Sequence, residues 1–305
     1  MSTAVASSDV GARPRRTSYV VVRALAASEL RRMVRTPVVP LGLGVSLWLM
    51  WTTTPQSERW SGAAYSELVT TSAPLLLAIS WVSAVSFHRE RTPVGAGTPV
   101  PDGLRVMGRV AASAPLVVLA LAFAVLLGIR ERGLGGLTLG TEPGRTTEAL
   151  HSVPELAQHV ALAVLAVALG AALGRRVSSL VLALPVLLVF WFAVAGISWL
   201  FGHRSVTPFA VVQVQPVTVP VGPATTDPLT YPAHWLLEPP GEFQEGWARL
   251  FVSTDLAWWH DGWVLGLALV LFAAAFPGGA VRRILLTTGL LTSVVCAAAQ
   301  VWVIP

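Results

Sequence analysis

The chain has 305 residues, of which 54% are hydrophobic and 12% charged, and its formal net charge is +5. Soluble domains carry about 25% charged residues, so this composition excludes an ordinary soluble protein. All basic residues are arginines that lie between apolar segments, as in a membrane protein, and no nucleic-acid partner is expected. The single cysteine, Cys296, excludes an intrachain disulfide.

The first 35 residues contain no span. Residues 1–17 are polar and lack the apolar stretch of a signal peptide, so we expect a disordered cytoplasmic tail. Residues 18–35 alternate apolar and basic positions at helical spacing, and Pro37 then ends the helix. The apolar face comprises Val22, Ala26, Leu30, Met33 and Val34, and the polar face Arg23, Ser28, Arg31, Arg32 and Arg35. The pattern predicts an amphipathic interfacial helix rather than a plain extension of the first span.

Seven apolar runs without Asp, Glu, Lys or Arg follow. They are residues 38–54, 68–87, 110–129, 156–174, 177–201, 263–281 and 284–304. Each approaches the ~20 residues that an α-helix needs to cross a bilayer. We therefore expect an all-α fold, a polytopic helical membrane protein with six or seven transmembrane helices after the interfacial helix. Residues 18–305 would form a single transmembrane domain.

The arginines predict the orientation of these spans. If the N-terminus is cytoplasmic, 15 arginines fall in inner segments and six in outer ones. Tryptophans gather at the outer ends: Trp60, Trp199, Trp235, Trp247, Trp258, Trp259, Trp263 and Trp302. Both biases favour a multi-pass protein of the bacterial plasma membrane with its N-terminus in the cytoplasm and its C-terminus outside.

The longest segment outside the spans is 202–262. Eight prolines exclude a long helix in its first two thirds. Further on, the helical spacing of Phe243, Trp247, Leu250 and Phe251 predicts a short amphipathic helix at the outer leaflet. Within the fourth run, Gly170 and Gly174 have the spacing that lets two helices approach closely, which indicates ordinary bundle packing.

Motifs for catalysis or cofactor binding are missing. The chain has no glycine-rich phosphate loop with a following Lys, no HExxH and no GxSxG, so we expect no enzyme activity and no cofactor. A metal site from His203, His234, His260, Asp255 and Asp261 is conceivable, but their spacing matches no known ligand pattern, and no metal is expected. His159 is expected to be a hydrogen-bonded interfacial residue. Because the runs offer no ionisable path, transport would need energy from a partner that hydrolyses ATP.

The loop at 88–109 contains the most informative motifs. It begins His88-Arg89-Glu90-Arg91, continues through Thr98-Pro99-Val100, and ends in an apolar-basic stretch, Arg105 to Arg109. In these motifs the chain resembles the permease subunits of type-2 ATP-binding cassette (ABC) exporters. Residues 18–35 are similar to the elbow helix of that family, and 202–262 to its re-entrant helices. The chain departs from the family in the seventh run and in a loop that leaves room only for a brief coupling helix, at about 102–109.

The resemblance implies a membrane-spanning permease subunit of an ATP-driven exporter. Its partners would be a cytoplasmic ABC ATPase subunit docking on the loop 88–109, a second permease subunit and membrane lipids. The residues expected at the docking surface are Glu90, Arg91, Asp102, Arg105 and Arg109. The alternatives are a non-transport assembly or scaffold protein that uses its outer loop and, least supported, an intramembrane enzyme. The sequence leaves the transported substrate open.

Overall fold

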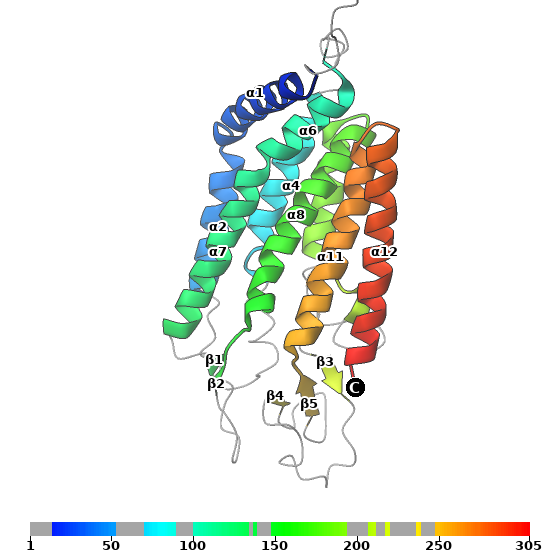
Figure 1. Cartoon of the computed structure of the whole chain (residues 1–305). Coiled ribbons are helices and arrows are strands. Elements are labelled where there is room, and N and C mark those ends of the chain that lie inside the picture. Colours follow the sequence, from blue (N-terminus) through cyan, green and yellow to red (C-terminus); the bar gives the residue numbers. More distant parts are fainter. Residues whose placement is uncertain are drawn as a thin grey trace, which may run out of the picture.

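Long apolar helices running side by side form most of the structure (Figure 1). The computed structural model describes residues 14–52, 70–89, 100–133, 137–138, 148–193, 207–211, 217–219, 236–238 and 248–305. The helices are α1 (Pro14–Val34), α2 (Val38–Thr52), α4 (Ala73–His88), α6 (Asp102–Ala112), α7 (Ala114–Gly133), α8 (Val153–Arg176), α9 (Leu180–Leu188), α11 (Thr254–Ala275) and α12 (Ala280–Val303). A π-helical turn, Val189–Ala193, continues α9.

Four helical stretches are long and apolar enough to cross a bilayer: α6 with α7, α8, α11 and α12. A fifth arises if α1 and α2, which meet at an angle of 59°, count as one broken span. α4 and α9 with its π-helical turn are apolar but shorter. The chain is thus a polytopic helical membrane protein with four to five candidate spans in its described part, where the sequence predicts seven.

The two ends of the bundle carry different elements (Figure 1). We call one the arginine end: it carries α1, α6, the end of α8 with Arg175 and Arg176, and the start of α12 with Arg282 and Arg283. We call the other the strand end, where the C-terminus lies. Its strands are β1 (Leu137–Thr138), β2 (Glu148–Ala149), β3 (Val217–Val219), β4 (Leu236–Glu238) and β5 (Ala248–Phe251).

The strands correct one prediction. Leu250 and Phe251, expected in an amphipathic helix, belong to β5, which pairs antiparallel with both β3 and β4. A short isolated helix is marginal in stability, whereas a central strand satisfies its backbone groups on both sides. Phe251 packs with Val217, Leu256 and Ile304 in a small hydrophobic cluster. The end of this segment is therefore buried as part of a strand and not as one face of a helix. Phe243 and Trp247 lie outside the described residues.

Helix boundaries also differ from the predicted runs. α11 begins at Thr254, nine residues before the predicted run 263–281, and ends at Ala275 instead of continuing through Pro277. Gly279 has a φ of 117°, a conformation that favours glycine, and it precedes α12. The turn between α11 and α12 therefore lies at the sequence Pro277-Gly278-Gly279, which ends one helix and allows the next to begin.

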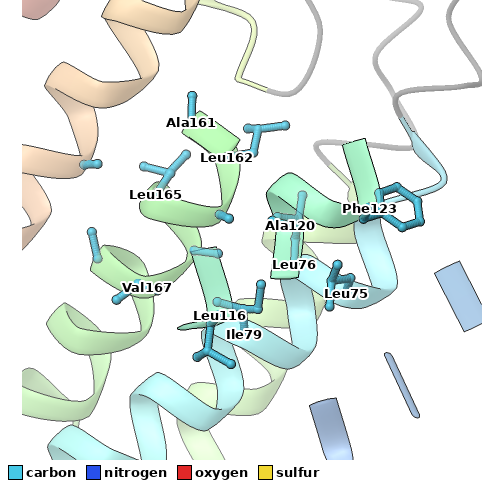
Figure 2. Packing of buried hydrophobic residues seen from close by; sticks show 14 of the residues in the cluster. Leu75, Leu76, Ile79, Leu116, Ala120, Phe123, Ala161, Leu162, Leu165 and Val167 are labelled. Atoms are coloured by element: carbon cyan, nitrogen blue, oxygen red, sulfur yellow. The ribbon is translucent and has the colours of Figure 1, made fainter. Parts of the chain in front are cut away.

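The main core lies where α4, α7 and α8 meet (Figure 2). α4 contributes Leu75, Leu76 and Ile79, all at most 1% exposed. Leu116, Ala120 and Phe123 come from α7, and Ala161, Leu162, Leu165 and Val167 from α8. The same buried cluster continues to Met33 of α1 and Cys296 of α12, so one core joins the whole bundle.

Glycines set the spacing between the most closely packed helices. A Cβ atom added at Gly170 would lie 2.2 Å from the backbone oxygen of Ser80, and one at Gly174 would lie 2.3 Å from that of Ala84. Between α11 and α12, a Cβ at Gly266 would lie 2.8 Å from the backbone nitrogen of Ser293. The close approach predicted from Gly170 and Gly174 is confirmed, and α4 is the helix they contact.

The helix predicted at 18–35 is present as α1, and it begins at Pro14, inside the predicted tail; residues 1–13 lie outside the described part. One face of α1 packs against α6, where a Cβ at Gly108 would lie 2.7 Å from the Cβ of Leu25. The predicted face is wrong at Val34, which is 71% exposed, while the acidic Glu29 is buried. The sequence pattern missed Glu29 because a charged residue counts against an apolar face.

Replacing Gly170 by Ala should destabilise the protein. The added methyl group meets backbone rather than a flexible side chain, so overpacking should cost about 1–3 kcal/mol and exceed the gain in helix propensity. Gly44→Ala in α2 is the matched control, because a Cβ there meets nothing within 4 Å. Thermal unfolding in detergent, followed by size-exclusion chromatography, checks the difference; equal melting temperatures would contradict the close contact.

Candidate functional site

Three of the predicted docking residues, Asp102, Arg105 and Arg109, belong to α6 at the arginine end. The other two, Glu90 and Arg91, lie outside the described residues. Asp102 and Arg105 form an ion pair in the first turn of α6, where the negative charge of Asp102 suits the helix N-terminus. Arg109, one turn further on, is half-buried.

α6 is placed by its own amphipathic pattern. Val106, Gly108 and Ala112 are buried, while Asp102 and Met107 face outward. Only Ser113, whose hydroxyl donates to the backbone oxygen of Arg109, separates α6 from the long helix α7. The brief helix expected at 102–109 is therefore present and extends to residue 112, although its coupling role remains a prediction.

A buried carboxylate joins α1 to the bundle near this layer. Glu29, 7% exposed, accepts from Nη1 of Arg32 at 3.1 Å and from the hydroxyl of Ser86 on α4 at 3.3 Å. A notch beside it is lined by Arg32, Met33, Thr36, Trp81, Val82, Val85, Ser86 and Arg89. Both hydroxyl groups of this lining already donate, that of Ser86 to Glu29 and that of Thr36 to the backbone oxygen of Arg32.

The strand end contains a second group of buried polar residues, which we call the polar layer. Its members come from four helices and the segment before α8: Glu131, His151, Glu155, Gln158, His159, His260, Asp261 and Gln300, each at most 5% exposed. The apolar pattern does not reveal this layer as a unit, because five of its members fall in segments predicted as outer loops. Helices α8 and α11 begin early enough to include three of these five, Glu155, His260 and Asp261.

Two contacts hold the entry to α8. Oε1 of Glu131, at the end of α7, accepts from the backbone N–H of His151 at 2.8 Å and lies 2.8 Å from its Nδ1. Glu155 completes a capping box with Ser152, whose backbone N–H and hydroxyl both donate to Oε2 at 2.7 Å. The sequence Ser152-Val153-Pro154-Glu155 carries the signal of such a box, with Pro early in the helix, and could have located this boundary.

Gln300 connects α12 to α11. Its Oε1 lies 3.4 Å from Nδ1 of His260, and its Nε2 donates to the backbone oxygen of Pro208 at 3.4 Å. His260 stacks on the buried ring of Trp263, with ring centroids 5.8 Å apart. Gln300 is fully buried, so these contacts fix the C-terminal end of α12.

Three buried groups of the polar layer have atoms without hydrogen-bond partners among the described residues. These are both carboxylate oxygens of Asp261, Nδ1 of His159 and Nε2 of His260. His159, expected at the interface, is 1% exposed and packs edge-on against Phe123 at 5.7 Å. Unsatisfied buried polar atoms are rare in folded proteins and call for an explanation.

The residues considered for a metal are not brought together. His203 and His234 lie outside the described residues, and Asp255 is exposed while Asp261 is buried. Within the described part of the chain, no group of three or more His, Cys, Asp or Glu residues is arranged to hold a metal ion.

Comparisons of the chain with protein-family models, curated proteins and solved structures found no match. The resemblance to ABC exporter permeases thus rests on the motifs of the loop 88–109 and on the pattern of spans.

Glu29→Ala should loosen α1 from α4 and α6. Removing this acceptor leaves Ser86 without its bond to Glu29 and should cost about 1.5–3 kcal/mol, as for hydrogen bonds to charged groups. Hydrogen exchange measured by mass spectrometry should show faster exchange in α1. The control is Ser28→Ala on the exposed side of the same helix, which should leave exchange unchanged. Equal exchange in both variants would mean that Glu29 does not anchor α1.

Proposed function

We propose that the chain is the membrane-spanning permease subunit of an ATP-driven exporter, energised by a separate ATPase that docks at the arginine end. The observation that supports this most is the layer formed by α1 and α6. The two helices pack against each other, and each leads directly into an apolar helix of the bundle. A layer of this kind can pass a movement from a docked partner to the spans.

The contacts of α1 and α6 indicate which helices of the bundle such a movement would reach. α6 continues into α7 after one residue, so a push on α6 displaces α7. The contact of Leu25 with Gly108 transfers the push to α1, which turns by 59° into α2. The bond between Glu29 and Ser86 also includes α4. Three bundle helices would thus respond to force on one exposed surface.

The proposal places the arginine end in the cytoplasm. The arginine bias of the sequence favours this orientation, and the strand end carries the exposed Trp258, Trp259 and Trp302, as expected at a membrane interface. Arg130 lies over the ring of Trp51 at 4.0 Å and donates to the backbone oxygen of Trp51 at 3.0 Å. This pair would hold α2 and α7 at the outer headgroup level.

All seven apolar helical segments would cross the membrane in this proposal. α4 has 11 buried residues among its 16 and runs between α2 and α8, so its shorter length would be accommodated inside the bundle. α12 exposes large apolar side chains such as Leu291, Val294 and Val295 to its surroundings. These would contact lipids or a second permease subunit, with which the path for the substrate would be formed.

The docking proposal predicts that an ATPase copurifies with the chain from its native host after crosslinking. Glu90→Ala combined with Arg105→Ala should abolish the stimulation of ATP hydrolysis by the permease without loss of expression, because it removes charges from the proposed docking surface. Arg132→Ala is the control, since this exposed arginine ends α7 at the strand end. Failure to find any ATPase would reject the exporter proposal. Unchanged ATP hydrolysis in the double variant would show only that the docking surface lies elsewhere on the chain.

Sidedness can be tested with a single cysteine at position 305. In a Cys296→Ala background, a membrane-impermeant maleimide should label Pro305→Cys from outside the cell, because α12 would carry the C-terminus across. Cys296 itself is 6% exposed and must be removed to avoid background. Labelling only after the cells are opened would show that the C-terminus lies inside and that the seventh crossing is wrong.

A further inference from the structure

Asp261 occupies an unusual position for a carboxylate. It lies in the second turn of α11, about 10 Å along the helix axis from Thr254 at a rise of about 1.5 Å per residue. The residue is 5% exposed, and neither of its side-chain oxygens has a hydrogen-bond partner among the described residues. An ionised carboxylate in such a place needs a cation or several donors nearby.

The surroundings of Asp261 supply no such cation in the described part of the chain. α8, which packs along α11, presents Glu155, close enough to interact electrostatically with Asp261, and His159. α12, on the other side, presents the neutral Gln300 and the thiol of Cys296. On α11 itself the neighbouring titratable groups are Asp255, which is exposed, and His260, which contacts Gln300.

Of the arginines whose side chains the structure describes, those nearest to this end are occupied or distant. Arg130 is held by Trp51, and Arg132 is exposed at the last turn of α7. Arg282 and Arg283 lie at the opposite end of α12. Among the described side chains, Asp261 therefore faces a second acid, Glu155, without a positive partner. Two buried carboxyl groups in this relation are stabilised by a shared or added proton.

We propose that Asp261 and Glu155 form a proton-binding carboxyl pair at the α8–α11 interface, in which Asp261 carries a proton at neutral pH. Glu155 accepts from the backbone N–H and hydroxyl of Ser152, so one of its oxygens is fixed as an acceptor. Asp261 lacks such donors and is the group that holds the proton. The ligand of this site is thus a proton taken up from the aqueous phase at the strand end.

This site has a different role from the proposed docking surface, and it does not depend on the exporter proposal. The docking surface lies at the arginine end on α6, whereas the carboxyl pair joins α8 and α11 at the strand end. Loss of the proton would place two negative charges across a tightly packed helix interface. The packing of α8 against α11 would then depend on the pH at the strand end.

Infrared spectroscopy of the full chain in lipid nanodiscs tests the proposal directly. A protonated carboxylic acid has a C=O stretching band that carboxylates lack, and labelling aspartate with ¹³C at its carboxyl carbon shifts that band. The chain has five aspartates: Asp9, Asp102, Asp227, Asp255 and Asp261. At neutral pH, labelled protein should show one shifted band, which disappears in Asp261→Asn and remains in the control Asp255→Asn.

A second variant covers the case in which Asp261→Asn does not fold. Replacing the other four aspartates by Asn leaves Asp261 as the one labelled carboxyl, and the shifted band should persist. Glu155→Gln retains a residue suited to the capping box but removes the neighbouring charge, so the band should disappear at a lower pH than in the unmodified chain. An unchanged pH for its disappearance would contradict the pairing of the two residues.

Two outcomes would overturn the site. Absence of any shifted band at neutral pH would show that Asp261 is ionised. Loss of the band when sodium replaces a bulky organic cation at constant pH would show that the pair binds sodium instead of a proton. Persistence of the band in both salts supports the proton.

Discussion

The close contact between the backbones of α4 and α8 is the constraint on which the rest of the bundle depends. In lipid, helices gain little from burying apolar side chains against each other, so association relies on close packing and polar contacts. Gly170 and Gly174 let the backbone of α8 approach Ser80 and Ala84 of α4 directly. α4 is then enclosed by α2, α8 and α9, which explains why a helix of only 16 residues can lie in the centre.

Placing a helix end inside the bundle requires partners for its free backbone groups. The hydroxyl of Ser46 on α2 accepts from the backbone N–H of Leu75 at 3.0 Å, near the start of α4. Further along, Trp191 in the π-helical turn donates from its indole nitrogen to the hydroxyl of Ser80 at 2.9 Å. Small residues thus have two roles in this bundle. Glycine and serine let the helices approach closely, and the serine hydroxyl groups also form hydrogen bonds with polar groups that this approach buries.

The sequence predicted the existence of the apolar helices well and their ends poorly. Apolar runs identify a span because the bilayer selects against charge, but the same rule stops each predicted span at the first acidic residue. Glu155 and Asp261 were therefore assigned to loops, whereas α8 begins with a capping box and α11 with a serine cap at Ser253. Cap signals, rather than hydropathy, would have placed both residues inside helices.

Other features follow from tertiary contacts that one sequence does not display. The buried Glu29 accepts a hydrogen bond from Ser86, which lies 57 residues away in the sequence. The residue spacing within α1 therefore gives no indication that Glu29 is buried. The strand β5 exists because β3 and β4 lie on either side of it, although its local spacing also suits a helix. In the first turn of α6, the pairing of Asp102 with Arg105 follows the usual i to i+3 rule and was open to prediction.

The two ends of the bundle balance their acidic side chains in different ways. At the arginine end, Glu29 and Asp102 each face an arginine three residues away, so their charges are compensated within one helix turn. At the strand end, Glu131 is matched by His151, while Asp261 faces Glu155 and has no arginine among the described neighbours. An apolar run free of charge thus does not mean a membrane domain free of ionisable groups. As proposed, a partner would act through α6 at one end and protons through α8 and α11 at the other, and these helices all contribute to the same core.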